Sequence, residues 1–344
     1  MAHVATVATV GIDLAKSVFQ VHGVDATGQV VLRRKLRRSE IERFFRELPP
    51  VLIGMEACGG AHFWARTLTS LGHTVRLMPP SYVKPYVKRG KTDALDAEAI
   101  CEAVTRPTMR FVAIKTELHQ AATIELKTRE LLVRQRSQAV SALRSHMAEY
   151  GVVAPKGLPR FEDLVLIVRD AEDRRLPAAA REVLVELVEH VKGLHERIER
   201  LDARMVRRTR EDETAQRLAT IPGVGAVTVT ALQALVPDPN GFASARHFAA
   251  WLGLTPRSHS SGGKERLGRI SKQGNPLLRR LLVLGASARL LHRQRREPSG
   301  DWMGRLLERR PFKIAAVALA NKMARIAWAL LTKGGTFRNT VAAA

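Results

Sequence analysis

The order of strand-like and helix-like segments in the first 80 residues narrows the possible folds more than any other feature of the chain. Five runs have the β-branched or apolar composition of strands: residues 4–13, 18–24, 30–36, 51–57 and 73–78. Helical patterns follow Ser39, the expected N-cap, to about Leu48, and cover residues 61–71. We therefore expect an α/β domain over residues 1–112, built on a mixed sheet that helices cover.

Two long segments further on have apolar residues at helical spacing among many charges. These segments, at about 116–150 and 178–210, predict exposed helices joined by a turn between Gly151 and Pro177. We expect them to form an antiparallel hairpin or coiled coil over residues 113–212 that serves self-association. Residues 213–335 predict a mostly α-helical C-terminal domain that contains a helix-hairpin-helix module.

The charge of the chain limits its partners. A net charge of +23 and an isoelectric point of about 11.1 attract polyanions, so nucleic acid is the expected partner. Anionic lipid would also attract a basic surface. However, neither a basic amphipathic helix nor an unbroken apolar run of membrane-spanning length stands out, so no membrane partner is expected. An aromatic content of 5% disfavours single-strand binding by base stacking.

Two further features bear on where the protein acts. Cys58 and Cys101 are too few for a disulfide framework and lack zinc-site spacing, which fits a reducing compartment. The N-terminus has no basic region before an apolar run, as a secretory signal would have. We expect a cytoplasmic protein associated with the nucleoid.

Four acidic residues stand where the predicted sheet would gather them. Asp13 and Glu56 end two predicted strands, which places them at one edge of the sheet. Asp93 and Asp96 lie three residues apart at the start of a predicted helix and share one of its faces. Divalent metals that serve phosphoryl transfer need oxygen ligands from several segments. We expect all four acids to be catalytic and to bind Mg²⁺, with Mn²⁺ as the alternative.

Each of these acids has an ordinary explanation when it is taken alone. Asp13 fits a turn residue and Glu56 a surface charge, while acids such as Asp93 and Asp96 are common at helix N-termini because they favour the helix dipole. Their joint placement in this topology favours the metal site.

Three segments that contain these acids resemble a known family. GIDLAK (11–16), GMEACGG (54–60) and KTDALDAEAI (91–100) resemble the acidic motifs of the DEDD transposases of the insertion-sequence 110 group, relatives of the pilin gene-inverting invertases. The resemblance implies a ribonuclease-H-like fold, as in the RuvC resolvase, for the first domain. It also implies metal ligation by the four acids. The residues after Glu56, Ala57-Cys58-Gly59-Gly60, differ slightly from the Ala-Thr-Gly that often follows this glutamate in the family.

A segment near the C-terminus extends the resemblance. Residues 249–282 are similar to the C-terminal transposase motif of the same family, in which a serine before glycine is the nucleophile, and that position is Ser261 here. No catalytic role carries over to Ser258, His259 or Ser260. Charge alone favours a basic loop that grips phosphate without chemistry, so the catalytic assignment of Ser261 depends on the resemblance.

Glycines and basic residues of the C-terminal domain are the expected nucleic-acid contacts. Gly223 and Gly225 lie between two helical patterns, where free backbone N–H groups at a helix N-terminus can receive a phosphate. From Arg257 to Arg296 the only acid is Glu265. The expected cationic contacts are Arg257, Lys264, Arg266, Arg269, Lys272, Arg279 and Arg280.

The resemblance implies a transposase, a site-specific recombinase that cuts and rejoins the donor and target DNA of an insertion sequence. It also implies a structured bridge RNA as guide, a covalent serine–DNA intermediate, and a homodimer or tetramer. Two alternatives stay open. A RuvC-like nuclease or Holliday-junction resolvase needs the acids but no serine, and a non-catalytic nucleic-acid-binding protein needs neither.

Overall fold

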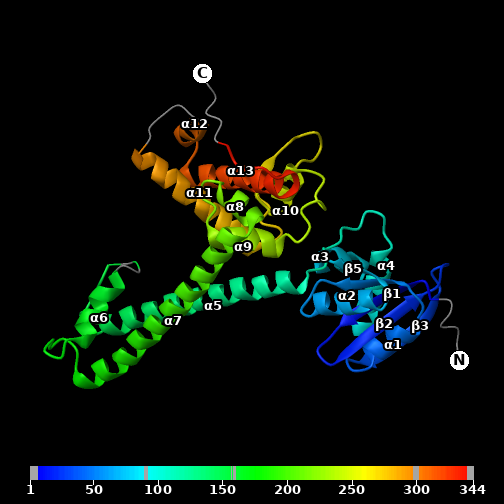
Figure 1. The fold of residues 1–344 in the computed structure, drawn as a ribbon, viewed down its shortest axis with the longest axis horizontal. Helices are drawn as coiled ribbons and strands as arrows, with labels where there is room; N and C mark the ends of the chain where they lie inside the picture. The colour runs from blue at the N-terminus through cyan, green and yellow to red at the C-terminus, as the bar shows by residue number, and fades with distance from the viewer. Residues whose placement is uncertain (1–6, 89–91, 156, 158–159, 297–301, 339–344) are drawn as a thin grey trace. The chain divides into compact units, whose positions relative to one another are not determined.

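The computed structural model describes residues 7–88, 92–155, 157, 160–296 and 302–338, and divides into two compact units (Figure 1). These units are Met1–Leu118 and His119–Ala344. Residues 4–6 of the first predicted strand and Lys91 of the third acidic motif lie outside the described residues. The division into three domains stays a prediction.

The first unit is built on a five-stranded mixed sheet with the strand order β3-β2-β1-β4-β5. Strands β1 (Thr9–Leu14), β2 (Val18–Val24) and β3 (Val30–Arg37) form an antiparallel meander. Strand β4 (Leu52–Glu56) pairs parallel to β1, and β5 (Thr74–Met78) pairs parallel to β4. The predicted mixed sheet and the order of its strands and helices along the chain are confirmed.

Helices cover both faces of this sheet because the strand residues alternate between two apolar clusters. On one face, α1 (Ile41–Glu47) and α2 (Ala61–Ser70) pack on a cluster that includes Ile12, Phe19, Ile53 and Trp64. On the other face lie α3 (Pro80–Val83), the 3₁₀ helix η2 (Lys84–Tyr86) and α4 (Asp93–Val104), with a smaller cluster around Met78 and Ile100.

The prediction that Ser39 caps α1 is wrong. Glu40 occupies the N-cap position, and no side chain caps the helix. The reason is a turn that precedes the helix: the Glu40 N–H donates to the Arg37 carbonyl (2.9 Å), and the Glu40 carboxylate accepts from the Arg37 N–H (2.7 Å). Ser39 therefore lies inside the turn rather than at the helix start.

Two long helices open the second unit, as predicted. Helices α5 (Glu117–Ala148) and α7 (Ala178–Glu211) are joined by the ion pairs Arg129–Asp202 and Arg208–Glu125. These pairs occur in opposite order along the two helices, so the helices are antiparallel. The segment between them is more than the predicted turn, because it contains α6 (Phe161–Arg169), whose Phe161, Leu164, Val165 and Val168 are buried in a cluster shared with both long helices.

The rest of the second unit is mostly helical, which confirms the prediction. Its elements are α8 (Glu213–Ala219), α9 (Ala226–Leu235), α10 (Ala245–Trp251), β6 (Pro256–Ser258), β7 (Leu267–Ile270), α11 (Pro276–Arg296), α12 (Trp302–Arg309) and α13 (Phe312–Lys333). The hairpin of β6 and β7 was not predicted from the sequence.

Helix α13 is long and apolar enough to cross a membrane by length and composition. Its Leu319, Ala320, Met323 and Ala327 are instead buried in the large core cluster of the second unit, together with residues of α9, α10 and α11. We therefore describe it as a core helix.

Candidate functional site

Two parallel strands place the first two acids side by side. Ile12 of β1 and Met55 of β4 are register partners, so Asp13 and Glu56 are the next residues along adjacent strands. In-register residues of neighbouring strands project from the same face of a sheet. Both carboxylates therefore project from the face that α4 covers, near the carboxyl ends of their strands.

Two glycines allow α4 to lie directly against this face. Gly11 and Gly54 are register partners, each two residues before its acid, and so they face α4 as well. A Cβ added to Gly11 would lie 2.2 Å from the carbonyl oxygen of Ala97, and one added to Gly54 would lie 2.8 Å from Cβ of Val104. Any side chain at Gly11 would thus push the helix backbone away from β1.

The direction of α4 brings its first turn to the acid of β1. Near its C-terminal half, Sγ of Cys101 donates to the Thr9 carbonyl (3.6 Å), and one turn earlier Ala97 covers Gly11. The helix therefore runs antiparallel to β1, and the preceding turn, with Asp93, reaches Asp13. Thr92 fixes the start of the helix, because its hydroxyl accepts from the N–H of Leu95 (3.3 Å).

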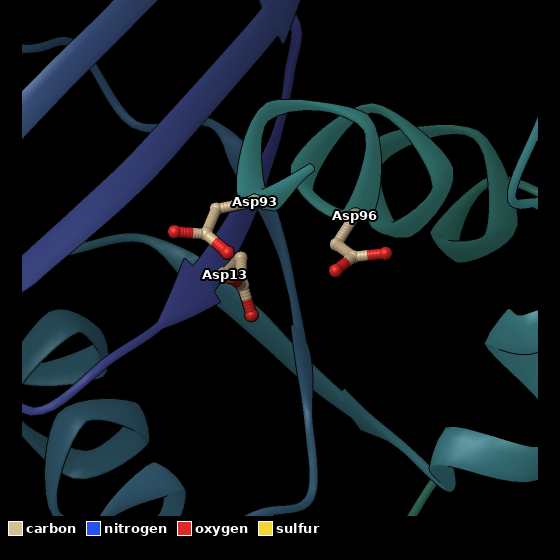
Figure 2. A group of neighbouring side chains, drawn as sticks. All are labelled: Asp13, Asp93 and Asp96. Carbon is tan, nitrogen blue, oxygen red and sulfur yellow. The ribbon is translucent and has the colours of Figure 1, made fainter. Parts of the chain in front are cut away.

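Three of the four predicted acids form one close group. Asp13, Asp93 and Asp96 each offer a carboxylate oxygen, and these oxygens lie within 4.8 Å of one another. Figure 2 shows Asp13 at the end of its strand beside the first turn of α4, which carries the two other aspartates. Glu56 is not part of this closest group, although it is near enough for its charge to be coupled to those of Asp13 and Asp96.

Burial and the repulsion between neighbouring acids disfavour the ionised forms of Asp13 and Glu56. Burial is the largest cause that raises the pKa of Asp13, followed by the charges of Asp96 and Asp93. Burial also raises the pKa of Glu56, followed by the charges of Asp13 and Asp96. Within the described residues, no basic side chain forms an ion pair with any of the four acids.

This donor set fits a divalent metal. Hard cations such as Mg²⁺ prefer carboxylate oxygens from a few side chains, and their charge offsets the burial and the repulsion that raise the pKa of Asp13. In a chain with a net charge of +23, three uncompensated aspartates that converge from two elements are more consistent with a cation site than with surface charge.

Ser261 lies in the second unit, at the tip of the hairpin that β6 and β7 form. Gly262 and Gly263 follow it with φ of 56° and 77°, a tight turn that only glycines adopt easily, and the Lys264 N–H donates to the Ser261 carbonyl (3.1 Å). The neighbouring serines are engaged: Ser258 Oγ and Ser260 Oγ are 2.8 Å apart, and Ser260 Oγ also accepts from the Arg266 N–H (3.3 Å). Ser261 is exposed.

Two protein families match this chain, one over the segment that contains the acids and one over the segment that contains Ser261. A family model described as "Transposase IS116/IS110/IS902 family" matches residues 215–299, and a DEDD model of the IS110 group, described as "Transposase", matches residues 10–152. The "Probable family 20 transposase" of Pseudomonas aeruginosa is 47% identical over 96% of this chain and 98% of its own length. The "Transposase for insertion sequence element IS1328" of Yersinia enterocolitica is 40% identical over 96% of this chain and 98% of its own length.

The chain belongs to the IS110 family of DEDD transposases. The expected kinship with the pilin inverting proteins is also confirmed. The "Pilin gene-inverting protein" of Moraxella lacunata is 27% identical over 60% of this chain and 57% of its own length.

The basic residues predicted to contact nucleic acid fall into two groups in this transposase. Three are bonded to the protein itself: Arg257 donates to the Ser271 carbonyl (2.8 Å), Arg279 donates to the Leu252 and Gln273 carbonyls (3.0 and 2.6 Å), and Arg280 pairs with Glu130 (2.7 Å). The others are exposed on or beside the hairpin, without an ion pair in the described part of the chain: Lys264, Arg266, Arg269 and Lys272. Their role as nucleic-acid contacts stays a prediction.

The two predicted phosphate-binding glycines of the transposase have different surroundings. Gly223 has φ of 89° and packs against α11, where an added Cβ would lie 2.6 Å from the Gly285 carbonyl oxygen. Gly225 is the N-cap of α9, and an added Cβ there would meet nothing within 4 Å. The packing explains the glycine at position 223, whereas position 225 is open to a ligand.

The sequence reasoning missed the residues that position the acids. Gly11, Gly54 and Thr92 lie within the acidic motifs, but no role was inferred for them. A signal was present, since a glycine two residues before the acid on two adjacent strands marks a strip without side chains on the face that carries both acids.

Proposed function

We propose that this transposase cuts and rejoins DNA with a divalent metal, Mg²⁺ or Mn²⁺, at Asp13, Glu56, Asp93 and Asp96 and with Ser261 as the nucleophile. The single observation that carries the proposal is the convergence of Asp13, Asp93 and Asp96 without a basic partner in the described residues. Asp13 and Asp96 are partly buried, and all three acids are held together because α4 lies directly on β1, which is not expected of unrelated surface acids. The family likeness of the segment around Ser261 supports the second half of the site.

The proposed chemistry is a transesterification. Ser261 Oγ attacks a DNA phosphate, a bond forms between Oγ and phosphorus, and the bond from phosphorus to one deoxyribose oxygen breaks. The proton of the serine hydroxyl passes to the leaving deoxyribose oxygen, which becomes a hydroxyl, so a serine–DNA phosphodiester conserves the energy needed for rejoining. A metal bound at the acids would offset the negative charge that accumulates on the phosphate in the transition state.

The remaining parts of the proposal are the fold family, the guide and the assembly. The mixed sheet, with acids at the ends of β1 and β4, is consistent with a RuvC-like fold. The antiparallel α5 and α7 supply a long surface for a coiled coil and a dimer or tetramer, in which the acids and the serine can come from different protomers. A structured bridge RNA would pair with donor and target DNA in the cytoplasm, near the nucleoid, and the strongly basic chain suits such a ligand.

A covalent-trapping experiment tests the serine. The purified transposase, with its copurifying RNA, is incubated with labelled DNA that contains the element end, and protein–DNA adducts are separated on a denaturing gel. The wild type and Ser258→Ala are expected to form the adduct, because Ser258 lies in the same hairpin but has no proposed role. Ser261→Ala and Asp13→Asn are expected to form none.

The same experiment distinguishes the alternatives. If Ser261→Ala cuts DNA as well as the wild type while Asp13→Asn is inactive, the protein is a metal nuclease or resolvase and the serine assignment fails. If Ser261→Ala and Asp13→Asn both cut DNA as well as the wild type, neither the serine nor the acids are catalytic. Sequencing of the copurifying RNA tests the guide, which requires a discrete RNA encoded beside the transposase gene.

A further inference from the structure

A basic groove adjoins the acid cluster of the first unit and has no role in the proposal so far. It has a volume of about 390 Å³ and lies between the start of α4 and the edge strand β3, with β2 as its floor. The lining includes Gln20 and His22 from β2, Arg33 and Lys35 from β3, and Thr92 and Glu98 from α4 or its cap.

The strand register connects this groove to the acids. Asp13 is the register partner of Gln20, and Gln20 is the register partner of Lys35. These three residues therefore form one row across β1, β2 and β3 on the face that carries the metal-binding acids. Neighbouring strands are roughly 4.8 Å apart, so the row leads from Asp13 to Lys35 over roughly 10 Å. Arg33 lies two residues from Lys35 on the same face.

The charge of the groove is positive. Arg33 and Lys35 in the groove, and Arg37 beside it on the same face of β3, are exposed, and none of them has an ion pair in the part of the chain that the structure describes. Glu98 is the acid in the lining, and its carboxylate is bonded to Lys88 of the neighbouring segment (2.5 Å). The groove thus presents cations without an ion pair beside the proposed metal site.

We propose that this groove binds the backbone phosphates that flank the reacting phosphate on the same DNA strand, with Arg33 and Lys35 as the contacts inside the groove and Arg37, further along β3, as a contact beside it. The proposal rests on the proposed function, because it takes the reacting phosphate to lie at the acids. Successive phosphates of one DNA strand are separated by roughly 3.4 Å along the helix axis and also wind around it, so Lys35, roughly 10 Å from Asp13, is placed to reach a phosphate one or two nucleotides from the reacting one. Cations placed at this distance fix the path of the strand without reading its sequence.

An ordinary structural explanation exists for the charges of β3. Edge strands often carry lysine and arginine because exposed charge prevents pairing with the strands of other molecules. This explanation requires charge of either sign, whereas phosphate binding requires positive charge. Charge reversal therefore separates the two explanations, since Lys35→Glu keeps a charge that protects the edge but repels DNA.

The first experiment compares Lys35→Glu with Arg46→Glu in the full-length protein. Arg46 is exposed on α1, which packs on the opposite face of the sheet, so the control makes the same change in net charge away from the groove. Binding of a short labelled DNA duplex is measured by fluorescence anisotropy with EDTA present, so that the result does not depend on cutting. Lys35→Glu is expected to weaken binding roughly fivefold or more relative to Arg46→Glu and to lower the salt slope by about one unit.

The second experiment identifies the ligand. A photo-crosslinking amino acid replaces Lys35, or Arg46 as the control, and the full complex with DNA and copurified RNA is irradiated. DNA cross-links at position 35 and not at position 46 support the proposal. Cross-links to RNA alone, or equal DNA binding by Lys35→Glu and Arg46→Glu, would overturn it. If instead Ser261→Ala and Asp13→Asn remain active while Lys35→Glu still loses DNA binding, the proposed function fails and the groove as a DNA site stands.

Discussion

The burial of Asp13, together with the repulsion around it, predicts that a loss of its charge stabilises the metal-free protein. Because the pKa of Asp13 is raised in the folded state, the folded protein binds its proton more tightly than the unfolded chain does. The associated stability is present below the ordinary value of 3.8 and is lost as the pH rises through the raised value. At neutral pH with EDTA, Asp13→Asn is thus expected to melt a few degrees higher than the wild type, with a difference that shrinks as the pH falls.

Divalent metal and a second acid give the controls for this prediction. Addition of Mg²⁺ is expected to raise the melting temperature of the wild type and to leave Asp13→Asn nearly unchanged, because the variant lacks one ligand. Asp25→Asn should show the opposite sign without metal, since a hydrogen bond from the Thr27 side chain, followed by one from the Gln29 N–H, lowers the pKa of Asp25. A wild type that is more stable than Asp13→Asn in EDTA at neutral pH would contradict the electrostatic account of the cluster.

The close contact between α4 and β1 predicts that a single methyl group added at Gly11 lowers both stability and activity. In Gly11→Ala the new Cβ would lie 2.2 Å from a backbone oxygen of α4, and backbone cannot yield as a flexible side chain can. We expect a loss of about 1–3 kcal/mol in the free energy of unfolding and a much larger loss of DNA cutting, because Asp93 and Asp96 move with the helix. Urea denaturation and the adduct assay measure the two effects.

A second glycine of the acidic motifs serves as the control. Gly59 has open space where a Cβ would go, so Gly59→Ala is expected to change the free energy of unfolding by less than about 0.5 kcal/mol and to keep activity. Equal behaviour of the two variants would show that contact between α4 and β1 does not position the acids.

Secondary structure was predictable from the sequence where a long pattern repeats, and not where tertiary contacts decide. The strands of the sheet and the helices α5 and α7 have clear periodicity, so their bounds are within a few residues of those predicted, except that the first strand begins at Thr9 rather than at residue 4. Helix α6 has only nine residues between prolines, and its apolar face is explained by burial against α5 and α7. Strands β6 and β7 have three and four mostly exposed residues, too few for an alternating pattern.

The candidate site was predictable to the same extent. Strand-end placement and helical spacing were enough to predict that Asp13, Asp93 and Asp96 converge, because backbone geometry alone determines which face each residue occupies. Whether Glu56 joins them within 4.8 Å depends on side-chain direction and on packing around the strand end, which no sequence pattern specifies. The bonding of Arg257, Arg279 and Arg280 to the protein has the same origin, since their partners are distant in sequence.

At the scale of the whole molecule, the positive charge predicts a steep dependence of DNA binding on salt. Each phosphate that a protein cation neutralises releases counterions, so the logarithm of the binding constant falls with the logarithm of salt concentration by about 0.9 per contact. Exposed, unpaired cations should contribute to this slope, while cations already bonded to the protein should not. Arg269→Gln, on the hairpin of Ser261, is therefore expected to reduce the slope by about 0.9 in anisotropy titrations over a range of salt concentrations.

Arg280→Gln is the matched control, because it removes the same charge from an arginine that Glu130 already neutralises. We expect it to leave the slope almost unchanged. If both variants change the slope equally, DNA binding responds to the net charge of +23 rather than to particular contacts. If only Arg269→Gln changes it, the hairpin that carries Ser261 is itself in contact with the DNA backbone, as a nucleophile at its tip requires.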